Sequence, residues 1–426
     1  MDKLENKSIC LAPWLSIHTW PDGSTFPCCV WDSDDPIGNI NDTDLTTIWN
    51  NSKLRDVRVK MLNGEKVKSC ERCHKLEELE PYSYRLKINK DFNDSFDIIE
   101  KTDKNGNVEE MKIKLWDFRL SNFCNLKCRS CGISLSSSWY GDLIELKPML
   151  KGKIKALISV NDKVSFMDMI ENQYDYVEEI YFAGGEPLIT PEHYTILDKL
   201  IERGNTNIRL RYSTNLTNLV YKGKHIFDYW KHFPNLEVLI SLDGVKKQGE
   251  YIRKGLNYSE LKQNVYALRD SGLTFTKVGF MVTYGVLNYE HLFDIILEFL
   301  KEDLTDKDFP VHGRYNLREI LFSPIYRPQN LDCSYLPSTF KKRYFQRLQN
   351  FGQELDKIDT HEKVKQDLIG KLKSVYEHST QNQYSRSIME SFVRDTVRLD
   401  EVRKEKFNDV FEGIDLFNDY TNDSLI

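Results

Sequence analysis

The sequence predicts an α/β protein: a partial (β/α)6 TIM-like barrel with a small N-terminal Cys-rich module and a C-terminal helical extension. Three observations support this fold class. From about residue 113 onward, short β-rich runs alternate with longer helical patterns, which is typical of βα units around a parallel sheet. Five of the nine cysteines fall within the first 73 residues, and a strongly charged, helically periodic tail begins near residue 337.

Six predicted strands follow one another along the central part of the chain. Helical patterns long enough to cross one face of the sheet separate the later strands. The strands are expected at 113–120, 177–183, 207–214, 236–243, 274–284 and 318–324, and the helices at 191–203, 257–270 and 288–302. Because the chemistry of parallel barrels lies at the C-terminal ends of the strands, residues just after each run are the first candidates for a site.

The flanking regions differ from the barrel in composition. Residues 1–84 are rich in turn formers and aromatics around their cysteines, with one helical pattern at 44–62. Residues 85–112 contain clusters of Asp, Asn and Gly and predict a polar linker or hairpin. The barrel core is expected at 113–330. Two or three packed helices at 331–426 carry charges that we interpret as a solvated face.

Composition narrows the classes of function. The chain has 426 residues, of which 40% are hydrophobic and 29% charged, as in soluble proteins of two or three domains. Its formal net charge of −6 gives no sign of a nucleic-acid-binding protein. No run approaches a membrane span, and the start lacks a signal-peptide pattern, so we expect a cytoplasmic protein. In that reducing compartment, cysteines indicate metal binding or catalysis.

The strongest motif is Cys124-Asn-Leu-Lys-Cys128-Arg-Ser-Cys131, directly after the first predicted strand. Three thiolates on one tight loop can hold three irons of a [4Fe–4S] cluster and leave the fourth iron without a protein ligand. A structural zinc site would want four ligands, generally from paired C-x2-C knuckles. The triplet therefore favours a reactive iron–sulfur cluster over zinc or an inert group of thiols.

This C-x3-C-x2-C loop resembles the defining motif of the radical S-adenosylmethionine (SAM) superfamily, and the resemblance extends over roughly residues 8–325. Gly184-Gly185-Glu186-Pro187 follows the second strand and looks like the family's GGEP motif. The tetrapeptide alone would suit a turn, but its place one βα unit after the triplet favours function. The two glycines would then let a ligand approach the backbone closely, and Glu186 would accept a hydrogen bond from an ammonium group.

Polar residues at the ends of later strands resemble family positions that line the SAM pocket near its ribose and carboxylate: Ser213, Asn215, Ser241 and Asp243. Helix caps and turns are the alternative for each of them. We expect Arg253 to pair with the SAM carboxylate as a bidentate donor, with a solvent-exposed arginine as the alternative. Many family members carry an aromatic residue before the third cysteine, where this chain has Ser130.

The resemblance implies a reaction as well as a cofactor. The amino and carboxylate groups of SAM would bind the open iron of the cluster held by Cys124, Cys128 and Cys131. Electron transfer from the reduced cluster would then cleave a carbon–sulfur bond and give a 5′-deoxyadenosyl radical that abstracts hydrogen from a substrate. The electrons would come from a reductant such as flavodoxin or ferredoxin.

A second set of cysteines lies in the N-terminal module: Cys10, Cys28, Cys70 and Cys73, with Cys29 as the spare. Thiolates from three separated segments make a four-ligand site for zinc or an iron–sulfur cluster, and spacing alone does not separate these metals. The pattern C-x12-G-x4-C followed by C-x2-C resembles the SPASM/twitch domains of many radical SAM enzymes, which implies a second, auxiliary [4Fe–4S] cluster. In most of those enzymes the module follows the barrel, whereas here it precedes it.

These features together predict a radical SAM enzyme. Because enzymes with SPASM/twitch modules often modify peptides or proteins, a peptide or protein side chain is the leading substrate class. A small metabolite, such as a sugar or nucleoside, is the alternative. A zinc-binding interaction module without catalysis is a further hypothesis, and it predicts partner binding that survives Cys128→Ala.

Overall fold

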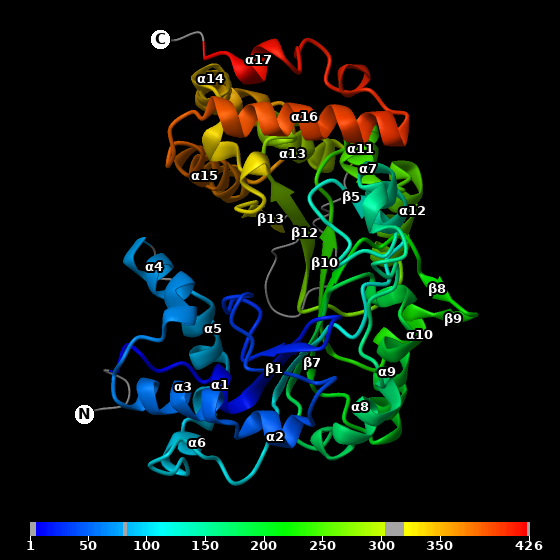
Figure 1. Ribbon diagram of the computed structural model, residues 1–426. Helices are drawn as coiled ribbons and strands as arrows, with labels where there is room; N and C mark the ends of the chain where they lie inside the picture. The colour runs from blue at the N-terminus through cyan, green and yellow to red at the C-terminus, as the bar shows by residue number, and fades with distance from the viewer. Residues whose placement is uncertain (1–5, 80–82, 303–318, 424–426) are drawn as a thin grey trace. The chain divides into compact units, whose positions relative to one another are not determined.

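The structure is a computed structural model that describes residues 6–79, 83–302 and 319–423 (Figure 1). The chain forms two compact units, each built from several segments. Unit 1 comprises residues 1–123, 157–211 and 232–235, and unit 2 comprises residues 124–156, 212–231 and 236–426. The division falls within strand β7 (Arg209–Thr214).

In unit 1, the N-terminal cysteine region and the first predicted strand share one sheet. β1 (Ser16–Thr19) pairs in parallel with β4 (Leu115–Phe118), which pairs in parallel with β6 (Glu179–Phe182). β1 also pairs antiparallel with β2 (Ser24–Phe26), and β2 with β3 (Gly38–Asn39). The sequence predicts a module that stands apart, but its strand β1 joins the sheet of the barrel core instead. All four residues of β1 are buried although three of them are polar, so no alternating pattern announces the strand.

The helices of unit 1 are α1 (Ala12–Leu15), α2 (Leu45–Trp49), α3 (Ser52–Leu62), α4 (Glu71–Leu79), α5 (Tyr84–Asp91), α6 (Asp97–Glu100), α8 (Lys163–Met169) and α9 (Pro191–Glu202). The single helix predicted at 44–62 is two helices, because the Asn51 side chain caps a new start by accepting a hydrogen bond from the Leu54 N–H at 2.9 Å. The predicted linker or hairpin at 85–112 contains α5 and α6. Ser83 caps α5, and its hydroxyl oxygen accepts from the Leu86 N–H.

In unit 2, the later predicted strands form a parallel set. β10 (Asn235–Ser241) pairs in parallel with β12 (Lys277–Tyr284), and β12 with β13 (Glu319–Pro324). The two-residue strands β5 (Lys127–Cys128) and β11 (Arg253–Lys254) form a separate antiparallel ladder. Residue 318, the first of the sixth predicted run, lies outside the described residues.

All six predicted runs contain strands, and the α/β class is confirmed. Within each unit the parallel strands follow one another in chain order, as βα units require. The described strands of neither unit close into a barrel, in agreement with a partial barrel.

The remaining elements of unit 2 are two short strands, β8 (Val220–Tyr221) and β9 (Lys224–His225), and the helices α7 (Trp139–Leu146), α10 (Ile226–Trp230), α11 (Lys246–Ile252), α12 (Tyr258–Arg269), α13 (Leu292–Lys301), α14 (Ser338–Leu355), α15 (Glu362–Ser379), α16 (Arg386–Arg403) and α17 (Asn418–Thr421). Phe299 of α13 packs on Phe280 of β12 with ring centroids 4.1 Å apart. The predicted C-terminal helices are present, and α14 packs on α15 (Figure 1). Among the residues described, no helix combines the length and the apolar character needed to cross a membrane.

Candidate functional site

The three-cysteine loop belongs to unit 2, and the start of the following helix holds its backbone. The Ser138 hydroxyl donates to the Cys124 carbonyl at 2.7 Å. The Trp139 indole N–H donates to the Cys128 carbonyl at 2.9 Å. Because both donors lie at the beginning of α7, that helix fixes two of the three cysteines from the C-terminal side of the loop.

Arg253 lies opposite Cys128 in the ladder of β5 and β11. Its Nη1 atom is 3.8 Å from Cys128 Sγ, and its Nη2 atom is 2.9 Å from Asp243 Oδ2. Asp243 also accepts a hydrogen bond from the Thr283 N–H at 2.8 Å. Both charged residues are buried, with exposed fractions of 8% for Arg253 and 1% for Asp243. The alternative of a solvent-exposed Arg253 is therefore wrong.

Burial dominates the acidity of this group. It raises the pKa of the Cys128 thiol to about 11, although the Arg253 guanidinium acts in the opposite direction. Burial lowers the pKa of Arg253, but the charges of Asp243 and Cys128 outweigh it and hold that pKa above its ordinary value. A metal that binds here must displace the thiol proton, because the thiolate is the ligand.

A pocket in unit 2 borders the loop. Ser130 and Asp243 form part of its lining, and most of the rest is aliphatic: Ile252, Val286, Leu287, Ile325 and Leu331. Apolar walls with a few polar groups suit a small ligand that has both kinds of surface. The buried Nε atom of Arg253 has no hydrogen-bond acceptor in the part of the chain that the structure describes. An anionic ligand group beside Arg253 would satisfy this donor.

The other predicted pocket residues of unit 2 have mixed surroundings. The Asn215 amide donates to Asn125 Oδ1, inside the cysteine loop, at 2.9 Å. Its own oxygen accepts from the Thr217 N–H at 3.0 Å, as in a turn. Ser213 and Ser241 are half-buried at the ends of β7 and β10. The structure thus brings Asn215 to the loop and gives it a turn-forming role as well.

The Gly-Gly-Glu-Pro segment belongs to unit 1. A Cβ atom on Gly185 would lie 2.2 Å from the Phe123 carbonyl oxygen, and the Glu186 N–H donates to that oxygen at 2.8 Å. Gly184 has a φ of +111°, which favours glycine. The Glu186 side chain is buried and accepts from the Leu188 N–H at 3.1 Å, next to Pro187. Backbone contact with the residue before Cys124 is thus a reason for the second glycine.

The N-terminal thiols also belong to unit 1. Burial raises the pKa of Cys10 to about 12, and the nearby Cys73 raises it further. The Cys28 pKa is raised by burial and then by Cys29 and Cys10, and the Cys70 pKa by burial and then by Cys10 and Cys73. The four predicted ligands are therefore within electrostatic reach of one another.

Cys29 faces a different environment. Burial raises its pKa to about 11, and the next contributions come from Asp117 and Arg119 of the β4 region. Burial also opposes ionisation of Asp117, but Arg119 and His18 outweigh it and hold the Asp117 pKa below its ordinary value. His18 Nδ1 lies 2.9 Å from Asp117 Oδ2. Cys29 thus lies beside this polar cluster as well as next to Cys28.

The distances between possible ligand atoms can be compared with the distances that a tetrahedral zinc site requires. Within the described ranges, one group of three or more Cys, His, Asp or Glu ligand atoms lies within 4.8 Å of one another: Asp332, Cys333 and His378. Tetrahedral zinc, at ~2.3 Å from each sulfur, would bring thiolates within ~4 Å of one another. Among the described residues, no three of the N-terminal thiols all lie within 4.8 Å of one another.

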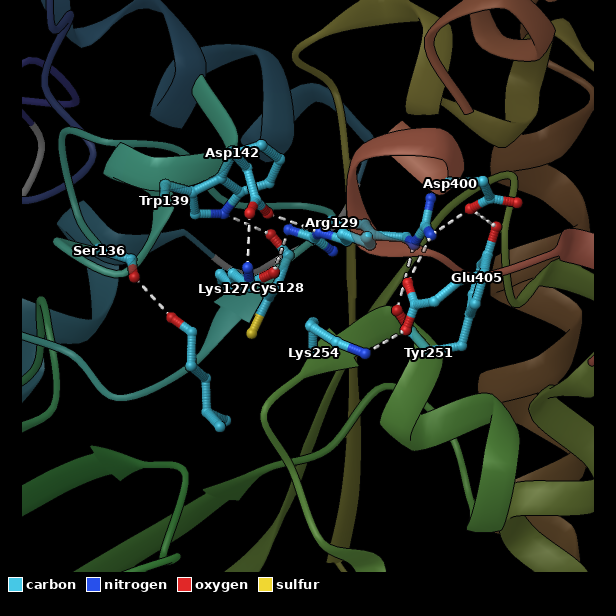
Figure 2. Close-up of polar contacts among 12 residues, drawn as sticks. Lys127, Cys128, Arg129, Ser136, Trp139, Asp142, Tyr251, Lys254, Asp400 and Glu405 are labelled. Carbon is cyan, nitrogen blue, oxygen red and sulfur yellow. Dashed lines mark hydrogen bonds and ion pairs between the residues drawn. The ribbon is translucent and has the colours of Figure 1, made fainter. Parts of the chain in front are cut away.

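Charged residues around Cys128 escaped the sequence prediction. Lys127 and Arg129 flank Cys128. Asp400, near the end of α16, pairs with Arg129 (Figure 2), and Arg403, the last residue of α16, donates to the Lys127 carbonyl. The interpretation of the C-terminal charges as a solvated face is wrong for these two α16 residues, which are buried. A signal was present in the motif itself, since it places a cation on each side of Cys128, and a buried cation such as Arg129 requires partners.

Parallel α/β units that carry a loop of three thiols beside a pocket, and a further set of four thiols, define an iron–sulfur protein. The sequence matches the profile of the radical SAM superfamily over residues 118–299 and that of the SPASM iron–sulfur cluster-binding domain over residues 10–74. The chain therefore carries a radical SAM region and, before it, a SPASM domain. The predicted resemblance is confirmed, and the two domains indicate [4Fe–4S] clusters together with SAM.

Several solved structures are distantly similar. SuiB from Streptococcus suis bound to its precursor peptide SuiA is 11% identical with a TM-score of 0.36, over 64% of this chain and 53% of that chain. SuiB bound to SAM is 11% identical with a TM-score of 0.34, over 70% of this chain and 62% of that one. TYW1 with a lysine-pyruvate adduct gives 13% identity and a TM-score of 0.29, over 59% and 76% of the two chains. The match spans less than two thirds of SuiB, and no curated protein matches the chain.

Proposed function

We propose that this protein reductively cleaves SAM at a [4Fe–4S] cluster held by Cys124, Cys128 and Cys131. The observation that carries the proposal is the position of Arg253. This buried cation lies opposite Cys128, 3.8 Å from its sulfur, and keeps a buried Nε–H without an acceptor among the described residues. A carboxylate bound to an iron beside Cys128 would complete the hydrogen bonding of this guanidinium.

The residues of unit 2 supply binding and orientation. Asp243 holds the Arg253 guanidinium through one edge and leaves the Nε–H for the carboxylate of SAM. Aliphatic residues such as Ile252 and Leu331 line the pocket and would exclude water from a reactive species. When bound, the cluster and SAM supply a 5′-deoxyadenosyl radical that abstracts hydrogen from the substrate. The protein's own contribution is to position the reacting groups.

The second cluster belongs to the N-terminal domain in this proposal. Cys10, Cys28, Cys70 and Cys73 would be its ligands, and the mutual influence of these four thiols on their pKa values is consistent with one shared site. Four thiolates leave no iron free, so this cluster would relay electrons or help to bind the substrate. Zinc is the alternative, and it would leave this module with a structural role.

The substrate we favour is a peptide or protein side chain. This part of the proposal rests on the SPASM domain, since the resemblance connects such domains with peptide modification. A small metabolite such as a sugar or nucleoside is the alternative. We also propose a cytoplasmic location and a flavodoxin or ferredoxin as reductant, because oxygen-sensitive clusters require reducing surroundings.

The test is anaerobic purification with iron, sulfide and zinc analysis, followed by a dithionite-driven assay for 5′-deoxyadenosine. About eight irons per chain, corresponding to two four-iron clusters, and SAM cleavage that Cys124→Ala abolishes would support the proposal. About four irons with one zinc, and cleavage retained, would support the SAM site and make the N-terminal site structural. Zinc alone without cleavage would favour a non-catalytic interaction module.

A second experiment separates the substrate classes. Deuterated candidate peptides should transfer deuterium into 5′-deoxyadenosine when the radical abstracts hydrogen from them. The same assay with labelled sugars and nucleosides is the matched comparison. Transfer from metabolites and from none of a broad peptide panel would overturn the peptide assignment while leaving SAM cleavage intact. Replacing dithionite by reduced flavodoxin or ferredoxin tests the proposed electron donor.

A further inference from the structure

The loop around Cys128 is attached to the C-terminal helix α16 by buried charges on both sides of the cysteine. On one side, the Arg129 side chain is 3% exposed and pairs with Asp400 and with Glu405, whose Oε2 atom is 3.0 Å away (Figure 2). The guanidinium also lies over the Tyr251 ring, 3.6 Å from its centroid. These contacts hold the Arg129 side chain in one orientation and keep it buried.

On the other side, Arg403 enters the loop from the last turn of α16. Its side chain is 0% exposed, its Nε atom donates to Asp142 Oδ2 at 2.7 Å, and its Nη2 atom donates to the Lys127 carbonyl at 2.7 Å. The guanidinium carbon lies 4.7 Å from the centroid of the Trp139 ring. That same indole donates to the Cys128 carbonyl. Arg403 therefore contacts the residue before Cys128 and the residue that holds its carbonyl.

The two sides are joined through the β5–β11 ladder, so they form one network. Lys127 pairs with Asp142, which also accepts from Arg403. Lys254, opposite Lys127 in the β5–β11 ladder, pairs with Glu405 at 2.8 Å. Figure 2 shows Lys254 and Arg129 converging on Glu405. The Lys127 carbonyl and the Arg129 side chain, on the two sides of Cys128, are thereby tied to the segment 400–405.

The charged composition of this network indicates that it fixes the arrangement of the loop more than it stabilises the fold. Buried ion pairs contribute little net stability compared with apolar residues of the same volume, because both charges lose their water. Their hydrogen bonds are directional, however, and they fix one arrangement of the groups that they join. Residues that hold metal ligands in this way affect metal sites by about 10- to 100-fold when they are replaced.

We propose that Arg403 is a positioning residue for Cys128, and that the end of α16 holds the cluster loop in the conformation that binds the cluster and SAM. The inference rests on the proposed function, because it takes Cys128 as a cluster ligand. It assigns a role in the SAM site to a helix that lies outside the matched radical SAM region.

The test compares wild type with Arg403→Met and with Arg394→Met, an exposed arginine of the same helix. In the apo protein, amide hydrogen exchange at residues 125–131 should become faster in Arg403→Met only. In the reconstituted protein, a chelator should remove about half of the iron roughly 10-fold faster or more in Arg403→Met. The iron of the N-terminal domain, which is the internal control for folding, should stay at the wild-type rate. The SAM-induced change in the electron paramagnetic resonance (EPR) spectrum should be lost.

Wild-type exchange, chelation and EPR spectrum in Arg403→Met would overturn the inference. If Arg403→Met fails to fold, Arg403→Lys decides, because lysine keeps the charge and cannot reach Asp142 and the Lys127 carbonyl together. Loop exchange and iron loss faster than in wild type would support the inference, and wild-type values would overturn it. The wild-type protein is measured before any variant is made. If it has no cluster that responds to SAM, the proposed function itself is overturned.

Discussion

Each of the two cysteine sets has a buried arginine beside it, and the two arginines differ in how fully they are engaged. Arg85, in the N-terminal domain, donates through Nε to Glu77 at 2.9 Å and through Nη1 to the Ile9 carbonyl at 2.8 Å. Its Nη2 atom also pairs with Glu77. Arg253 pairs with Asp243 but keeps a buried Nε–H without an acceptor in the described chain.

This difference distinguishes a closed site from an open one. In the proposed N-terminal site, four thiolates would leave no iron open to an outside ligand, and the Nε, Nη1 and Nη2 atoms of Arg85 already have partners. Three thiolates and an unsaturated arginine leave both an iron and a donor available. Three of the four N-terminal cysteines, Cys10, Cys28 and Cys73, are buried and Cys70 is partly exposed, whereas all three cysteines of the loop are partly exposed. The comparison leads to four experiments, from the largest expected effect to the smallest.

The first experiment removes one thiol from each set. Cys128→Ala should abolish SAM cleavage and lose about half of the iron, because the cluster that binds SAM loses a ligand. Cys10→Ala should lose the other half and keep dithionite-driven SAM cleavage. Iron analysis and a 5′-deoxyadenosine assay measure both. Loss of cleavage in Cys10→Ala with the loop cluster intact would show that the two sets do not act as separately as we infer.

The second experiment replaces the two arginines by lysine, which keeps each charge near its carboxylate. Arg253→Lys should weaken SAM binding by about 10- to 100-fold, the value of a hydrogen bond to a charged group, with unchanged iron content. Arg85→Lys should leave SAM affinity as in wild type. Titration of the reduced protein with SAM, followed by EPR, measures the affinity. Equal SAM affinity in the two variants would remove the distinction between them.

The third experiment tests the link between the Gly-Gly-Glu-Pro turn and the loop. In Gly185→Ala, the new methyl group meets the Phe123 carbonyl at 2.2 Å, so we expect ~1–3 kcal/mol of destabilisation from overpacking. Cys124 follows Phe123 directly, so the loop set should lose iron before the N-terminal set does. Denaturant unfolding measures the stability. The control is Gly141→Ala in α7, where nothing lies within 4 Å of the added atom; equal behaviour of both variants would contradict the proposed link.

The smallest effect is expected at Cys29. Cys29→Ser should keep the full iron content, because Cys29 is not in the proposed ligand set and the groups that act most on it after burial are Asp117 and Arg119. Cys28→Ser, one residue earlier, should lose the N-terminal cluster. The adjacent pair gives a matched control for the chemistry of the substitution. Iron loss in Cys29→Ser equal to that in Cys28→Ser would place Cys29 among the ligands.

The sequence predicts the strands of the core better than the elements around them. Each of the six runs is rich in β-branched and aromatic residues, and local composition is enough to place them. β1 escapes because Ser16, His18 and Thr19 are polar yet buried, so its pairing with β4 depends on tertiary contacts. α5 escapes because its residues are mostly polar and charged, and the Ser83 cap is the main local signal.

The candidate site shows the same difference between features that local sequence determines and features that depend on tertiary contacts. Local spacing identifies the cysteine triplet, since its three ligands lie on one loop. The partners of Arg129 and Lys127 lie 271 to 276 positions further along the chain, and no periodicity connects them. A charged helical pattern predicts a solvent-exposed helix when the partners of its charges are not known. For this reason the sequence places Asp400 and Arg403 on a solvated face.

The attachment of the cysteine loop to α16 also limits how this enzyme can be truncated and how its domains can be exchanged with those of relatives. A recombinant fragment that ends at residue 299, where the radical SAM match ends, would keep the whole motif and lack Asp400, Arg403 and Glu405. Arg129 and Lys254 would then lose their acidic partners, and Asp142 would keep only Lys127. An exchange of catalytic cores between relatives should therefore transfer the loop and the segment 386–411 together, as a single cassette.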